Sequence, residues 1–180
     1  LSRLQNARDQ CQSPGMSMRE KIRLTDPEIR DLLQTARAMS LVTQGPRGYP
    51  HAVAMWFGLD EDLTVRMSTY ATSQKVRNIE RNPKVSLLVE TGIAYNELKG
   101  VMIEADAEVV PDALDETIQT MIEANARVGL QLPALHELAD ELKQQMAGKR
   151  VLLRIKPRRF ISWDHGKLLS AQTPAAIRDS

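Results

Sequence analysis

The sequence of 180 residues is poor in cysteine, in aromatic side chains and in net charge. Its one cysteine, Cys11, excludes an internal disulfide framework and a cysteine-cluster metal site. The formal net charge of +1 gives the whole chain no electrostatic attraction to nucleic acid or to a membrane surface. No apolar run reaches the length of a membrane span. We therefore expect a cytoplasmic protein that binds neither nucleic acid nor a membrane.

Familiar catalytic motifs are also absent. The chain has no glycine-rich dinucleotide motif, no Walker loop, no G-x-S-x-G nucleophile elbow and no H-E-x-x-H zinc motif. Its three histidines, His51, His136 and His165, are far apart and fall in a predicted strand, a predicted helix and a terminal loop. A metal site built from them would need a coincidence of folding, so we expect none. The sequence names no catalytic residue.

The composition, with 42% hydrophobic and 26% charged residues, is that of one globular domain. Residues 1–20 lack a continuous apolar segment, and we expect a disordered N-terminal extension there, either a leader or an added segment, with Met16 and Met18 as alternative starts. Residues 21–170 are expected to form the domain, and residues 171–180 a C-terminal tail.

The spacing of apolar residues predicts an α+β fold. Helical spacing follows Thr25, with Pro27 in the first turn. Short apolar or alternating runs then predict strands at residues 40–43, 51–59, 63–68, 84–90 and 101–110. With a last strand near the C-terminus, about six mostly antiparallel strands are expected, and closure of their sheet into a small barrel would remove exposed edges.

The region between residues 111 and 165 is predicted to hold a helical hairpin and the last strand. The first helix would have Asp112 as N-cap and end at Gly129, and the second would run from Pro133 to Gly148. We expect this pair to lie across the sheet. The last strand follows in "RVLLRIKPRRFISW", and a bend or bulge is expected at Pro157, which has no amide hydrogen to donate.

A short helix in "TSQKVRNIERNP", residues 72–83, has an unusual distribution of charge. Ser73 is its expected N-cap and Asn82-Pro83 its stop signal, yet Lys75 lies in the first turn, where the helix dipole disfavours a cation. A bound phosphate would reverse that cost, because the first amides of a helix, nearby hydroxyls and an ammonium together form an anion pocket. The alternative is a solvated helix whose charges bind nothing specific.

The motif K-x-R-N-(x)3-N-P in this helix, followed by the strand "KVSLLVE", resembles the flavin-binding split-barrel superfamily of the pyridoxamine 5′-phosphate oxidase type. The chain is most similar to the branch of deazaflavin-dependent oxidoreductases that use coenzyme F420. The resemblance extends from about Ile22 to Leu168. It implies a six-stranded antiparallel Greek-key split β-barrel that forms a homodimer, with the cofactor in a groove between protomers and its phosphate at the helix start.

The resemblance also implies roles for individual residues. The phosphate would lie at Lys75 and Asn78 with the two preceding hydroxyls, and Arg77 would lie close by. Trp163 would close the site of the neighbouring protomer, with plain interface packing as the alternative, whereas Trp56 is expected in the core rather than as a cofactor lid. The implied phosphate-side and ring-side positions are Thr72, Ser73, Lys75, Asn78, His51, Val53, Met55, Met67, Ser68 and Thr69.

Departures from the pattern bear on the cofactor and the reaction. The strand "HAVAMWFG" carries no cation, and the C-terminal arginine motif of true pyridoxamine phosphate oxidases is absent, so vitamin B6 oxidation is not expected. The implied activity is hydride transfer between F420 and a small organic acceptor, with an FMN-dependent enzyme as the alternative. A polyglutamyl tail would need further cations, and the candidates are Arg47, Arg77, Lys156, Arg158 and Arg159.

Two competing functions come from other classes. A small basic barrel could bind nucleic acid through "RVLLRIKPRR", although aromatic residues make up only 4% of the chain and offer few stacking platforms. A haem-cleaving split barrel would need an axial histidine that the sequence does not place.

Overall fold

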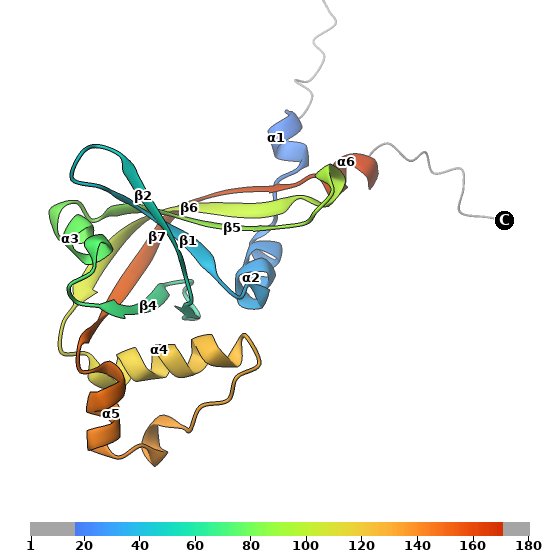
Figure 1. Cartoon of the computed structure of the whole chain (residues 1–180). Helices are drawn as coiled ribbons and strands as arrows, with labels where there is room; N and C mark the ends of the chain where they lie inside the picture. Colours follow the sequence, from blue (N-terminus) through green and yellow to red (C-terminus); the bar gives the residue numbers. More distant parts are fainter. Residues whose placement is uncertain (1–16, 171–180) are drawn as a thin grey trace, which may run out of the picture.

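The computed structural model describes residues 17–170, which form one curled sheet with helices at its ends (Figure 1). Residues 1–16 of the predicted disordered extension lie outside the described residues. The last part of that extension carries a short helix. The predicted tail, residues 171–180, lies outside them entirely. In this part of the chain the helices are α1 Met18–Lys21, α2 Asp26–Thr35, α3 Gln74–Arg81, α4 Leu114–Ala126, α5 Asp140–Ala147 and α6 Gly166–Ser170.

The sheet is antiparallel, and its strand order is β2-β1-β5-β6-β7-β4-β3. The predicted α+β class is confirmed, and the sheet is an open, curled half-barrel. The described residues contain seven strands rather than the expected six. Their bounds are β1 Met39–Gln44, β2 Pro50–Met55, β3 Gly58–Leu59, β4 Val65–Tyr70, β5 Lys84–Thr91, β6 Lys99–Val110 and β7 Arg150–Asp164.

The additional strand arises because the single strand predicted over residues 51–59 is broken. β2 and β3 lie at opposite edges of the sheet, and only Trp56 and Phe57 separate them in sequence. The three Cα–Cα steps from Met55 to Gly58 span no more than about 11 Å, so the sheet must curl until its two edges approach each other at this point. The other ends of β2 and β4 have no such link, and both lie toward α3 (Figure 1). We call the strip of the concave face between these two strands, β2 and β4, the slot.

The core fills the concave side of the sheet. Residues of β6 alternate as predicted, because Val101, Ile103, Ala105 and Ala107 are buried. Helix α2 begins at a capping box of Thr25 and Glu28 and buries Ile29, Leu32 and Leu33 against the same cluster. Helix α3 adds Val76 and Ile79. These contacts anchor both helices that flank the slot.

The predicted helical hairpin is only partly correct. Helix α4 packs on β4 and β7, and a small separate core of Ile118, Leu138 and Ala147 joins it to α5. The second helix does not run from Pro133: a 3-10 turn at Leu135–Glu137 precedes α5. Asp112 is not the N-cap, because it has φ of 57° in the preceding turn and Ala113 takes the cap position.

The predicted bulge in the last strand is confirmed. Opposite β6, Glu104 pairs with Arg159 and the next residue, Ala105, pairs with Pro157. Arg158 is therefore the extra residue, and the register shifts where proline cannot donate a hydrogen bond.

Candidate functional site

The beginning of α3 gathers one ammonium and two hydroxyls. Lys75 Nζ donates a hydrogen bond to Thr69 Oγ1 at 2.9 Å, and Thr69 Oγ1 lies 3.4 Å from Ser73 Oγ. Thr69 is the last but one residue of β4, and the turn from Tyr70 to Ser73 brings the chain straight into α3. Ser73 is the N-cap, as predicted, but its side chain makes no capping hydrogen bond. The hydroxyl and the first amides of α3 therefore face the same side as the ammonium.

The electrostatics of this cluster favour an anion. No Asp or Glu oxygen among residues 17–170 forms an ion pair with Lys75. Burial of its ammonium lowers the pKa of Lys75, because desolvation disfavours the charged form. A dianionic phosphate would restore the charged state and would also meet the positive end of the helix dipole. The exposed Thr72 lies one residue before the cap, and the exposed Arg77 lies one turn further along the helix.

Asn78 does not have the predicted direct role. It is 0% exposed, and Asn78 Nδ2 donates to Thr43 Oγ1 at 2.9 Å while its carbonyl oxygen accepts from Gln74 and Arg81. No surface of Asn78 is left for a ligand. Its side chain instead links α3 to β1, and the sequence could not reveal this because Thr43 lies 35 residues away.

The ring-side positions on β2 line the concave side of the slot. His51, Val53 and Met55 pair with Thr43, Leu41 and Met39 of β1, respectively, whose side chains are buried. All three β2 residues are half-buried. His51 Nδ1 is enclosed and has no hydrogen-bond partner in the described residues. An unpaired buried nitrogen costs about 1–3 kcal/mol, so this histidine is suited to meet a polar atom of a bound molecule.

Two of the three positions predicted on β4 do not face the slot, although Ser68 Oγ, like His51 Nδ1, is enclosed without a hydrogen-bond partner in the described residues. Met67 is 0% exposed and belongs to the core. Ser68 points to the opposite face of β4, the face on which Arg66 bonds to Thr120 and Glu123 of α4. Only Thr69, at the end of the strand, reaches the rim of the slot. The sequence prediction treated the strand end as one contact surface, whereas the alternation of a strand allows every second residue.

The two tryptophans lie on the outside of the sheet. Trp56 is 47% exposed, so its predicted place in the core is wrong. It lies in the two-residue link between the edges of the sheet, where Phe57 turns inward and Trp56 outward. Trp163 is half-buried on β7.

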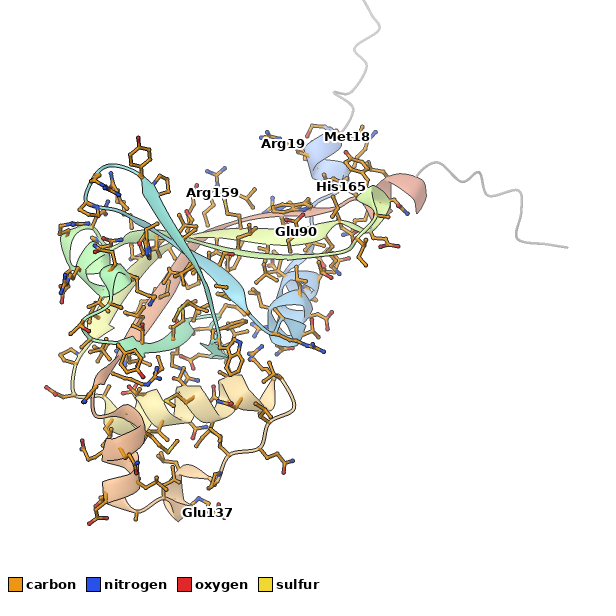
Figure 2. All side chains as sticks on the ribbon, viewed as in Figure 1. Met18, Arg19, Glu90, Glu137, Arg159 and His165 are labelled. Carbon is orange, nitrogen blue, oxygen red and sulfur yellow. The ribbon has the colours of Figure 1, made fainter. Side chains whose placement is uncertain are left out.

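Other features give no second chemical centre in the described part of the chain. No group of three or more metal-binding side chains occurs there. His165 packs against Tyr95 with the two rings tilted by 51° and their centroids 4.5 Å apart, at the far tip of the sheet (Figure 2). A groove of about 730 Å³ lies on the convex side of β1, β5 and β6, but neither Lys75 nor Thr69 lines it. The anion cluster is thus an open rim rather than a closed cavity.

Comparison with known proteins decides the family. The pyridoxamine 5′-phosphate oxidase profile matches residues 25–164, which include the slot and the anion cluster. The chain belongs to the pyridoxamine 5′-phosphate oxidase family. The predicted resemblance is therefore confirmed at the level of this flavin-binding split-barrel superfamily. No curated protein matches the sequence at a significant level.

Several solved structures have a similar fold, and their descriptions differ. The conserved hypothetical protein Rv2991 from Mycobacterium tuberculosis is 34% identical, with a TM-score of 0.73, and the match covers 92% of this chain and 99% of that one. A protein described as an F420 reductase is 26% identical, with a TM-score of 0.55 and coverage of 73% and 94%. A FAD-binding protein from Mesorhizobium loti, 17% identical with a TM-score of 0.55 and coverage of 77% and 91%, shares the fold.

Proposed function

We propose that this protein is an oxidoreductase that binds coenzyme F420 and transfers a hydride between the cofactor and a small organic acceptor. The observation that carries the proposal is the half-buried Lys75 ammonium, held by Thr69 at a helix start and without an acidic partner in the described residues. Such a site fits a phosphate. The likeness to a protein described as an F420 reductase supports the proposal that this phosphate belongs to the deazaflavin.

The residues of the slot suit a planar cofactor. Thr69, Ser73 and Lys75 would hold the phosphate at one end, and His51, Val53 and Met55 would line the ring. The enclosed His51 Nδ1 offers one hydrogen bond to a polar atom of the ring system. The bound cofactor supplies the hydride chemistry. The protein binds and orients it, and the apolar side chains of β2 keep water from that face.

The alternative cofactor is FMN, and membership of the pyridoxamine 5′-phosphate oxidase family supports it. FMN carries the same phosphate, so the anion cluster does not separate the two. The absence of any Lys or Arg from β2 favours the deazaflavin in our proposal, because the cations that true pyridoxamine phosphate oxidases carry on that strand are missing.

A homodimer is the assembly that we propose around this site. The convex face of the sheet carries a patch of small and apolar side chains that no described helix covers, namely Val42, Ala52, Ala54, Leu88, Met102 and Ile161. Arg159 projects from the same side of the sheet, away from α2 (Figure 2). The Glu104 and Arg159 pair at the margin of the patch has both signs of charge, which is self-complementary across a two-fold axis.

The nucleic-acid alternative loses its main support. In "RVLLRIKPRR", Leu152, Leu153 and Ile155 are fully buried at the centre of the sheet. Three of its arginines are paired with carboxylates: Arg154 with Glu116, Arg158 with Asp106, and Arg159 with Glu104. The segment is a neutralised core strand and not a free basic surface. The same pairs leave Arg158 and Arg159 less suited to hold a polyglutamyl tail. None of the described helices is long and apolar enough to cross a membrane.

A titration of the purified protein against F420, FMN and haem, followed by fluorescence and absorbance, tests the proposal. We expect F420 to bind most tightly, and reduced F420 to be oxidised only when an acceptor is present. Tighter binding of FMN would move the protein to the FMN-dependent alternative. Binding of haem alone would overturn both.

A further inference from the structure

The helices between β6 and β7 have a core of their own. Ile118 of α4 packs with Leu138 and Ala147, and the main core of the sheet includes none of the three. The partly buried Met121 of α4 lies on the same small cluster. The apolar side of α4 is therefore turned toward α5 and away from the sheet (Figure 1). We call residues 114–147 the α4–α5 unit.

The contact between α4 and the sheet is rich in polar groups. Arg66 of β4 donates from Nη1 to Thr120 Oγ1 at 3.1 Å and from Nη2 to Glu123 Oε2 at 2.7 Å. The side chain of Arg66 is only 12% exposed, and Asp60 accepts from its Nε. Ser68 faces the same side of β4, and its enclosed Oγ has no hydrogen-bond partner in the described residues. Such groups can exchange their partners for water, and Ser68 would gain one, so this contact should open more readily than an apolar core.

Gly58 of β3 leaves room for the ion pair between Arg66 and Glu123. Gly58 is the partner of Arg66 in the β3–β4 ladder. A Cβ added to Gly58 would lie 2.7 Å from Glu123 Oε2 and 3.3 Å from Arg66 Nη2. Glycine weakens a strand, and a close approach of other groups is a common reason for its presence there. The carboxylate of Glu123 thus lies directly against the backbone of β3.

The end of α4 holds the residue just before Gly58. The guanidinium of Arg127, the C-cap of α4, lies 4.5 Å from the ring centroid of Phe57. Two consecutive residues of the segment that joins the sheet edges, Phe57 and Gly58, are therefore in contact with α4. The chain itself allows Met55 and Gly58 any separation up to about 11 Å. The contacts that hold this segment must therefore place the two edges of the slot.

We infer that the α4–α5 unit is a clamp, which opens as one body and sets the width of the slot. With the contact of Arg66 and Glu123 made, β3 and the segment before it are fixed. With that contact broken, the unit moves off the sheet, and the edge strands β2 and β4 can separate. The clamp thereby regulates entry to the slot and exit from it. The control of cofactor entry rests on the proposed function, whereas the opening of the unit does not.

A thiol placed in the contact reports opening without any ligand. Ser68→Cys, combined with Cys11→Ser, gives a single thiol enclosed between β4 and α4. A water-soluble aromatic disulfide reagent should reach this thiol only when the unit opens. Val101→Cys, in the main core, is the control for global unfolding. We expect the thiol at position 68 to react at least about a hundredfold faster than that at position 101, and its rate to depend less on urea. Equal rates would overturn the clamp.

Breaking the ion pair should favour the open state. Glu123→Ala should speed labelling at position 68 about tenfold. Asp115→Ala is the matched control, because Asp115 pairs with Lys143 inside the unit, and its labelling rate should stay within about twofold. Equal effects of the two variants would overturn the role of the contact.

Gly58→Ala tests the same contact from the side of β3. Its Cβ would displace the Glu123 carboxylate, so labelling at position 68 should again speed up about tenfold. In the Glu123→Ala protein, Gly58→Ala should change the rate by less than about twofold, because the displaced group is already gone. Independent effects of the two substitutions would show that β3 and α4 are not linked through this carboxylate, and that outcome overturns the inference.

Cofactor kinetics test the control of entry. In stopped-flow mixing with F420, and with FMN in parallel, Glu123→Ala should raise the association and dissociation rate constants about fivefold each, so that Kd stays within about twofold. Faster dissociation alone, or unchanged rate constants, would overturn the control of entry. If the protein binds neither cofactor, the proposed function fails, while the thiol reactivity still decides whether the unit opens.

Discussion

At the scale of single residues, the charge of Lys75 is the feature most open to test. Its ammonium donates to Thr69 and lies at the start of α3 without an acidic partner among residues 17–170. The cost of burying it is visible in its lowered pKa. A buried ammonium without an acidic partner is expected where a ligand uses its charge, or where the energetic cost of burying it is small.

Lys75→Ala should weaken cofactor binding about ten- to a hundredfold, which corresponds to a charge-assisted contact of roughly 1.5–3 kcal/mol. The apo-protein should keep its stability within about 0.5 kcal/mol, because the mutation also removes a poorly solvated cation from the positive end of a helix. Fluorescence titration and urea unfolding measure the two effects.

Arg37→Ala is the matched control for Lys75→Ala, because it removes an exposed cation after α2, at the other end of the sheet from α3 (Figure 1). The affinity of the Arg37→Ala variant for the cofactor should stay within about twofold of the wild-type value. Equal losses in the two variants would mean that general positive charge attracts the ligand, and that α3 holds no positioned phosphate site.

At the scale of elements, α2 is held at both ends by side chains from distant parts of the chain. At its C-terminal end, one guanidinium nitrogen of Arg127 donates to the carbonyl oxygens of Leu33, Gln34 and Ala36 at 3.0, 2.8 and 3.3 Å. The same group lies 4.5 Å from the ring centroid of Phe57. Helix α2 has no basic residue in its own last turn, so Arg127 supplies the cation that a C-terminus favours.

Arg127→Ala should lower the free energy of unfolding by about 1–2 kcal/mol, because three partly exposed carbonyl oxygens lose a charged donor and Phe57 loses its cation–π contact. Arg127→Lys should recover little of this loss, since an ammonium lacks the planar fork that stacks on Phe57 while it donates. Urea unfolding measures the change in the free energy of unfolding. Hydrogen exchange at Leu33 and Gln34 shows whether the loss lies at the end of α2. A loss below about 0.5 kcal/mol for the alanine variant would contradict this account of the α2 end.

The N-terminal end of α2 should make stability depend on acid. The hydrogen bond from Lys167 and then the amide of Thr25 lower the pKa of Glu28 from 4.5 to about 2. The folded pKa is below the unfolded one, so this carboxylate stabilises the protein above about pH 4.5, and the contribution disappears as the pH falls toward 2. About a third of the Glu28 side chain is exposed, so solvent screening limits the contribution to about 1 kcal/mol or less.

Glu28→Gln is the variant that isolates this carboxylate. Its stability deficit relative to the wild type should be largest near pH 6 and should shrink as the pH approaches 2. Urea unfolding at several pH values measures the difference. A deficit that stays constant with pH would assign the effect to the lost capping geometry instead of the charge.

At the scale of the whole molecule, the main core fills the concave side of the curled sheet, and α4 covers the opposite face only around β4 and β7. The convex patch around Met102 and Ile161 stays uncovered, and the slot between β2 and β4 stays open. A second copy on the convex patch would bury the apolar face and would bring Trp163 into the partner's slot. In our proposal, assembly and cofactor binding are therefore linked.

Ile161→Glu should convert the dimer to a monomer of 20.2 kDa in sedimentation, because it places a charge within the proposed apolar contact. Cofactor affinity should fall with assembly, by at least tenfold. Leu142→Glu, on the exposed surface of α5, is the matched control and should change neither. A wild-type protein that sediments only as a monomer, or an Ile161→Glu monomer with full affinity, would disprove the shared site.

The sequence determined the local elements wherever a short-range pattern was decisive. The alternation of β6 predicted its buried face, Pro157 predicted the bulge, and the stop signal at Asn82-Pro83 predicted the end of α3. The motif around Lys75 was enough to predict the superfamily. Each of these signals depends on backbone geometry or on contacts within a few residues, and the order of amino acids states such constraints directly.

Only the tertiary structure decided which side chains meet. Asn78 became a buried link because Thr43 lies beside it across the fold, and Met67 entered the core because strand alternation turned it away from the slot. Trp56 turned outward because the chain crosses there from one edge of the sheet to the other. These outcomes depend on how the sheet curls and on pairings between distant strands, and no local sequence pattern records either.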